Sequence, residues 1–241
     1  MIQETKSPQN VATMPARSSL VGGRLVGAAA IAFAVLFVTE NVIFAATDAL
    51  TYAAPIEEVL AYYAANRDAL AIVSGLVALY LPLLLVFVTG LHGLVERRGG
   101  AGADASRLAV GAGAAVSAIF VLVNVLQIGL VLSAGGLAEP TPAFELVWQA
   151  HAAAVAMMLP MLGATLIGAA LASHASGLTS AWQRLLGLLG GSLLLAAGVG
   201  SLAIAEGSAL LFVGLLGLAA LLVWLVATGL RLMRTRTNAV L

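Results

Sequence analysis

The sequence predicts an all-α membrane protein: a polytopic bundle of six transmembrane helices with both termini in the cytoplasm. Three observations lead to this fold class. Six apolar stretches follow one another along the chain, and nearly all basic residues fall in the segments that the six spans would place on one face of the membrane. In addition, 61% of the residues are hydrophobic and only 9% are charged. Soluble domains carry about 25% charged residues, so this composition is typical of a chain that lies in lipid.

Each apolar stretch reaches the roughly 20 residues that a helix needs to cross about 30 Å of hydrocarbon. Inside a bilayer, only helices and closed barrels satisfy every backbone hydrogen-bonding group, and these Leu, Ala, Val and Gly runs lack the alternation of barrel strands. We expect one transmembrane domain over residues 20–232. Its helices are predicted at residues 24–46, 69–94, 107–133, 145–172, 184–204 and 208–230.

The basic residues predict the orientation of this bundle. Ten of the eleven lysines and arginines fall in segments that share one face of the membrane, which leaves only Arg67 on the other face. Lys and Arg are retained on the cytoplasmic side, whereas acidic residues contribute little. Both termini are therefore expected in the cytoplasm. The ten residues are Lys6, Arg17, Arg24, Arg97, Arg98, Arg107, Arg184, Arg231, Arg234 and Arg236.

The two ends of the chain are predicted to be cytoplasmic tails. Residues 1–19 mix Lys, Gln, Ser, Pro and Asn without periodicity, which is typical of a disordered segment. Residues 233–241 form a second tail, short and basic. Neither tail is long enough to bury a core of its own, so no soluble domain is expected there.

The loop after the first span contains a pattern of its own. Pro55 is followed by apolar residues at a helical spacing, from Ile56 to Tyr63, with Glu57 and Glu58 in the first turn, where the helix dipole favours acids. This pattern predicts a short amphipathic helix over residues 55–66 on the outer face. It has two interpretations: a lid across the mouth of the bundle, or an anchor in the membrane interface.

Glycines within the spans indicate close helix packing. Small residues four apart let helix backbones approach each other where the hydrophobic effect offers no drive for association. Such faces could pack within the chain, in a homo-oligomer or against another membrane protein. The pairs are Gly23 with Gly27, Gly111 with Ala115, and Gly187 with Gly191.

Polar residues inside the spans give the one candidate site. At a rise of 1.5 Å per residue, Glu40 lies roughly 24 Å above Arg24 and Asn124 roughly 26 Å above Arg107, while His151 lies roughly 9 Å below Glu145. All three are therefore expected in the outer third of the membrane. Together with their polar neighbours they form a candidate binding cluster: Glu40, Asn41, Asn124, Gln127, Gln149 and His151.

This cluster leaves two function classes open. Ionisable groups in a bilayer are costly and often functional, so Glu40 and His151 could form an acid–histidine pair in a site that binds or transports a small solute, an ion or a lipid. Alternatively, the amides and the imidazole only hold the helices together, in a non-catalytic scaffold or subunit of a larger complex. A cavity that joins Glu40, Asn124 and His151 would favour the first class, and a dry interior the second.

Several kinds of chemistry have no support in the sequence. The absence of cysteine excludes disulfides and thiolate catalysis. The three histidines form no zinc motif, no serine lies in a Gly-x-Ser-x-Gly context, and no phosphate-binding loop is found. We therefore expect no enzymatic activity, metal or cofactor. The zero net charge gives no reason to expect nucleic acid, and the expected partner is the lipid bilayer.

Three short motifs carry a resemblance to a known group. They are AYYAANR at residues 61–67, GLVALYLP at residues 75–82, and WQRLLGLLGG at residues 182–191, which opens the fifth span. Their order resembles that in a family of six-span integral membrane proteins of actinobacterial type, which carry a domain of unknown function. The resemblance covers nearly the whole chain and implies the fold and a location in the bacterial cytoplasmic (inner) membrane. It implies no activity and no site residues.

Overall fold

The computed structural model describes residues 17–234, with side chains from residue 22 onward. The predicted tails over residues 1–19 and 233–241 lie mostly outside this part; α1 begins inside the first and α8 ends inside the second. The described residues form eight helices: α1 (Arg17–Ala46), α2 (Ile56–Ala65), α3 (Arg67–Arg97), α4 (Ala103–Ala134), α5 (Pro142–Ala175), α6 (Ala181–Val199), α7 (Ser201–Ala205) and α8 (Leu210–Arg234).

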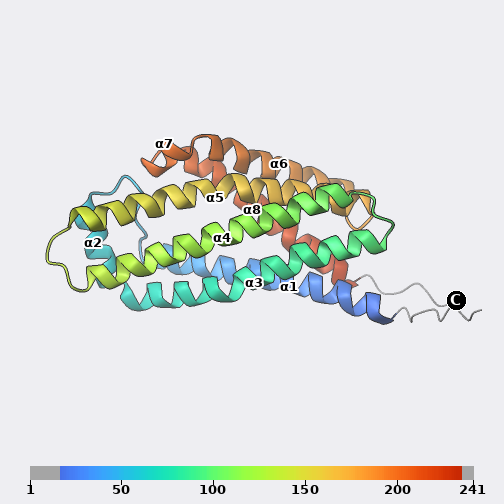
Figure 1. The fold of residues 1–241 in the computed structure, drawn as a ribbon, viewed down its shortest axis with the longest axis horizontal. Helices are drawn as coiled ribbons and strands as arrows, with labels where there is room; N and C mark the ends of the chain where they lie inside the picture. The colour runs from blue at the N-terminus through green and yellow to red at the C-terminus, as the bar shows by residue number, and fades with distance from the viewer. Residues whose placement is uncertain (1–16, 235–241) are drawn as a thin grey trace, which may run out of the picture.

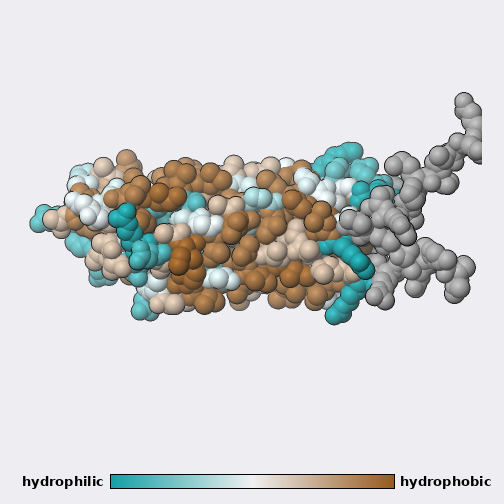
Figure 2. Space-filling view, turned by 90° about the horizontal axis from the view of Figure 1, so that it is seen from below, coloured by the Kyte–Doolittle hydropathy of each residue, from teal (hydrophilic) through white to brown (hydrophobic). Residues whose placement is uncertain are grey.

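Six of these helices are long and apolar enough to cross a membrane, namely α1, α3, α4, α5, α6 and α8. The predicted all-α bundle is therefore confirmed, and the chain is a multi-pass membrane protein. Figure 2 shows a broad hydrophobic belt around the middle of the molecule, with hydrophilic residues gathered toward its two ends. Large apolar side chains on this belt are exposed, as expected where the solvent is lipid.

The six long helices form a closed ring in the order α1, α3, α4, α5, α6, α8 and back to α1, and α5 is the most buried of them. The first turns of α1 and the last turns of α8 lie at the same end of the bundle, and α2 lies at the opposite end (Figure 1). We call these the terminal end and the α2 end.

Glycines bring several neighbouring helices into backbone contact. A Cβ added to Gly27 of α1 would lie 2.5 Å from the carbonyl oxygen of Gly229 on α8, and one added to Gly163 of α5 would lie 2.7 Å from that of Gly191 on α6. Only glycine permits such an approach. Of the predicted small-residue pairs, those in α1 and α6 pack inside the chain, whereas Gly111 of α4 has open space beside it.

The fifth span differs from its prediction. A helix was expected over residues 184–204, but α6 ends at Val199, and the separate short helix α7 follows Gly200. A side chain at Gly200 would collide with Leu210 at the start of α8. The glycine therefore allows the chain to turn back closely, and the apolar composition alone did not reveal this break.

The predicted amphipathic helix is present as α2, and its apolar stripe faces the bundle. Val59, Leu60 and Tyr63 are buried, in a cluster with Phe144 and Trp148 of α5 and with residues of α3 and α4. This cluster is separate from the main core, which runs along the rest of the bundle. Helix α2 therefore packs across the end of the bundle, in agreement with the lid geometry.

Candidate functional site

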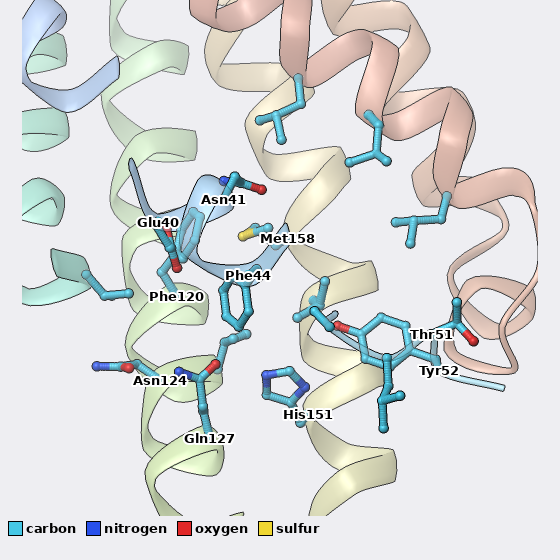
Figure 3. Close-up of a pocket in the computed structure, with 18 of the residues that line it drawn as sticks. Glu40, Asn41, Phe44, Thr51, Tyr52, Phe120, Asn124, Gln127, His151 and Met158 are labelled. Carbon is cyan, nitrogen blue, oxygen red and sulfur yellow. The ribbon is translucent and has the colours of Figure 1, made fainter. Parts of the chain in front are cut away.

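A cavity of about 320 Å³ lies toward the α2 end, between α1, α4, α5 and α8 (Figure 3). Its walls come from four long helices, with one residue from α3, and the loop over residues 47–55 and α2 contribute the rest. Five of the six residues in the predicted cluster line it: Glu40, Asn41, Asn124, Gln127 and His151. The lining is otherwise largely apolar and aromatic.

Three polar atoms in this cavity are buried without a hydrogen-bond partner among the described residues. They are Oε2 of Glu40, Oδ1 of Asn124 and Nδ1 of His151, and each comes from a different helix. Glu40 and His151 are each only 7% exposed. Buried polar groups in proteins nearly always have a partner, so three orphans around one cavity indicate a place where a ligand could supply the missing hydrogen bonds.

The predicted acid–histidine pair does not form. Within the described residues, Glu40 and His151 make no hydrogen bond and no ion pair with each other, and both instead face the shared cavity (Figure 3). The cavity that separates them is lined by phenylalanine, methionine and leucine side chains, which leaves room between the two groups. The sequence predicted the depth of both residues but not the distance across the bundle.

Below Glu40, four aromatic rings form what we call the aromatic layer: Phe33, Phe37, Tyr80 and Phe120. Their centroids lie between 5.3 and 6.2 Å apart, mostly in edge-to-face contacts, which are favourable for aromatic pairs. Phe33 and Tyr80 are fully buried. This layer separates the cavity from the half of the bundle at the terminal end.

Two amides of the cluster are partly occupied by contacts with α3. The side-chain nitrogen of Asn124 donates to the Ser74 carbonyl oxygen at 3.4 Å, and that of Gln127 donates to the Ser74 hydroxyl at 3.5 Å. The Asn41 amide donates to the Phe37 carbonyl oxygen within its own helix, at 2.8 Å. These bonds are the interhelical and intrahelical contacts expected of a structural role, and they still leave Oδ1 of Asn124 without a partner among the described residues.

Gln149 does not belong to the cavity, and its inclusion in the cluster has no support from the geometry. It is exposed, and its side-chain nitrogen donates to Oε1 of Glu145 at 3.1 Å. Residues two apart on a helix point about 200° apart, so Gln149 and His151 cannot share a face. Trp148, three residues before His151, shares that face instead.

His151 lies in an aromatic setting that the sequence analysis did not assemble. Its ring stacks on Trp148 with an interplanar angle of 10° and a centroid distance of 5.7 Å. The ring centroid of Tyr52, from the loop before α2, lies 5.1 Å from that of Trp148 and 6.1 Å from that of His151. Burial raises the pKa of the Tyr52 hydroxyl, so this group is neutral at physiological pH. The spacing of Trp148 to His151 was a signal in the sequence, whereas nothing local predicts the position of Tyr52.

The lining also limits what the site can hold. Glu40 is its single carboxylate, and within the described residues no lysine or arginine lines it. No group of three or more metal-binding side chains gathers anywhere in residues 17–234. The polar lining is therefore one acid, one histidine and three amides in a hydrophobic chamber, which is the usual composition of a site for a small organic molecule.

No protein-family model, curated protein or solved structure matches this chain.

Proposed function

We propose that this multi-pass membrane protein binds a small organic molecule in the cavity at its α2 end. The observation that carries the proposal is the convergence of three unpartnered buried polar atoms, from Glu40, Asn124 and His151, on one cavity of about 320 Å³. A volume of this order suits a small organic ligand better than a bare ion, which would leave most of the apolar lining uncovered.

The scaffold alternative has less support. A scaffold role was suggested by the glycine-rich helix faces. The glycines in α1, α5, α6 and α8, however, make contacts within the chain and are not open to a partner. Gly75 of α3 and Gly111 of α4 have open space beside them, where a partner could pack. The amide bonds to Ser74 are the structural contribution of the cluster, and they involve neither Glu40 nor His151.

The orientation is part of the proposal. The one-sided basic residues support a cytoplasmic terminal end, so the α2 end and the cavity face outward, in the cytoplasmic membrane of a bacterium of the type that the sequence resembles. Reporter fusions test this. A reporter after Leu241 should be active only in the cytoplasm and one at Gly136 only outside; the reverse pattern would overturn the orientation.

Ligand binding is tested by native mass spectrometry of the purified protein and by analysis of its organic extract. We expect a low-mass compound that copurifies with the parent protein. It should be lost or strongly depleted in His151→Ala, because this change removes a cavity wall and an unpartnered nitrogen. Gln149→Ala is the matched control on the same helix, since its side chain points away from the cavity. Identical extracts from the parent and His151→Ala would contradict the proposal.

A further inference from the structure

We infer that the ligand is a lipophilic ammonium ion, and that it enters the cavity from the membrane through an opening between α1 and α8. This inference rests on the proposed binding function and adds to it the charge of the ligand and its route. It is carried by the charge balance of the lining, its aromatic rings, and the way the two helices separate.

The charge balance of the cavity favours a cation. Glu40 is buried, and its Oε2 makes no hydrogen bond among the described residues. The neighbouring Tyr80 hydroxyl can donate to this carboxyl group but carries no charge that would balance it. The lining contains no basic side chain other than His151, so a ligand that carries a phosphate or carboxylate would meet no counter-charge there. An ammonium group would provide the missing charge, because an unpaired carboxylate in a low-dielectric site is costly.

The hydrogen-bonding atoms agree with this choice. The Asn124 Oδ1 is an acceptor only, a Glu40 carboxylate accepts through both oxygens, and the His151 Nδ1 accepts in the neutral tautomer with its proton on Nε2. An ammonium group has N–H donors and no acceptor, so it can donate to any of these atoms, and only Glu40 also offers it the opposite charge.

The aromatic lining gives the cation further contacts and the apolar part of the ligand a place to pack. Seven aromatic side chains face the cavity, and a cation within about 6 Å of such a ring is attracted to its face. The leucines of α8 and the methionine and valine of α5 supply purely apolar walls. The seven are Phe37, Phe44, Tyr52, Tyr62, Tyr63, Phe120 and Trp148.

The opening follows from the course of α8. At the terminal end α8 meets α1, at Gly229 and Gly27. Toward the α2 end, Gly217 and Gly214 place it instead against α6 and α5, where a Cβ on Gly217 would lie 2.7 Å from the Gly190 carbonyl oxygen. Helices α1 and α8 therefore diverge, and the cavity lies between their diverging halves.

The cavity reaches the lipid-facing surface where these helices diverge. Asn41 on α1 and Leu215 on α8 both line the cavity and are both exposed, Leu215 by 43%. Each is five residues from the end of its helix, which places both about 8 Å below the α2 end. This depth lies within one leaflet, whose hydrocarbon is about 15 Å thick. A molecule dissolved in that leaflet with its charged group near the interface can therefore reach Glu40 sideways.

Charge selectivity is tested with three probes of the same chain length: dodecylammonium, dodecanol and dodecanoate. The purified full-length protein is placed in lipid nanodiscs, and its thermal unfolding is followed as each probe is titrated. We expect saturable stabilisation by dodecylammonium, weaker stabilisation by dodecanol and none by dodecanoate. In Glu40→Gln, the apparent affinity for dodecylammonium should fall at least about tenfold, to that of dodecanol.

The outcomes separate this inference from the function on which it rests. Equal stabilisation by dodecylammonium and dodecanol, unchanged in Glu40→Gln, would overturn the cation and leave the binding function standing. If no probe stabilises the protein, the ammonium ligand is also overturned. The presence or absence of a copurified compound would then decide the binding function independently. Should Glu40→Gln prove unstable, the comparison of the three probes on the parent protein still decides the charge.

The route is tested by association kinetics. Stopped-flow quenching of tryptophan fluorescence by ω-brominated dodecylammonium reports arrival at Trp148 in a background with Trp182→Phe and Trp224→Phe, which leaves Trp148 as the single tryptophan of the sequence. We expect Leu215→Phe to slow association several-fold, because a larger side chain narrows the opening. Leu216→Phe is the control, since Leu216 is 65% exposed and does not line the cavity. Equal rates in the two variants would overturn lateral entry.

Discussion

At the terminal end of the bundle, α1 and α8 meet backbone to backbone at Gly27 and Gly229, while toward the α2 end the same two helices stand on either side of a cavity of about 320 Å³. The two regions also differ in where buried polar atoms lack hydrogen-bond partners. Six buried polar side-chain atoms of the described residues lack partners. Three belong to residues that line the cavity and a fourth belongs to Tyr80 in the aromatic layer, whereas two, from His174 near the end of α5 and Trp224 of α8, lie toward the terminal end.

Polar side chains also join neighbouring helices at the terminal end. The buried Gln183 of α6 accepts from both the backbone and the hydroxyl of Ser180, and it donates to the Thr228 hydroxyl on α8 at 3.3 Å. His92 of α3 and Ser106 of α4 form a second interhelical pair at 2.7 Å. Close backbone packing therefore stabilises the terminal end, while the α2 end keeps a cavity that is lined by three unpartnered polar atoms, as binding sites often are.

We expect the largest change in stability when the contact between Gly27 and Gly229 is disrupted. In Gly27→Val, the added side chain would meet the Gly229 carbonyl oxygen and push α1 away from α8, so stability should fall by about 1–3 kcal/mol or more. Thermal unfolding in detergent measures it. Gly111→Val is the control, because nothing lies within 4 Å of its Cβ position while the change in helix propensity is the same. Equal effects in both variants would mean that the glycine contact does not hold this end together.

A second comparison uses one buried polar group from each half. Glu40→Leu removes a carboxyl group with an unpartnered oxygen and should raise the thermal stability of the ligand-free protein, by about 1 kcal/mol. Gln183→Leu leaves the Ser180 and Thr228 groups without their partner and should lower stability by about 1–3 kcal/mol.

The signs of these two effects, measured in the same detergent, decide between a site and a structural role for Glu40. If Glu40→Leu destabilises the protein as much as Gln183→Leu does, the carboxyl group is part of the packing. The contrast between the two halves would then be lost.

The smallest effect is expected at the contact between α3 and α4 near the cavity. Ser74→Ala removes the acceptor of the 3.5 Å bond from Gln127, and interhelical bonds of this kind average about 0.6 kcal/mol. Thr89→Ala is the control on the same helix, because its hydroxyl bonds only backbone oxygens of α3. A loss near 2 kcal/mol in Ser74→Ala alone would show that the amides hold the cavity walls together and would strengthen their structural interpretation.

The amino-acid sequence alone was enough to predict the membrane class and the approximate spans, and it assigned a depth to the candidate residues. Span length follows from bilayer thickness and helical rise, which are fixed quantities, so Glu40, Asn124 and His151 were assigned to a common depth before any packing was known. The same helical geometry places Gln149 and His151 on different faces of their helix, so proximity along the chain is not sufficient to assign Gln149 to the cluster.

Which helix faces contact each other could be read only from the tertiary structure. Helices such as α1, α4 and α5 are apolar on every side, so their sequences do not distinguish the face that contacts protein from the face that contacts lipid. The divergence of α1 and α8, the break at Gly200 and the placement of Tyr52 beside His151 all depend on contacts between residues far apart in the chain. In lipid, close packing and hydrogen bonds select these contacts because burial of apolar surface is no longer a driving force.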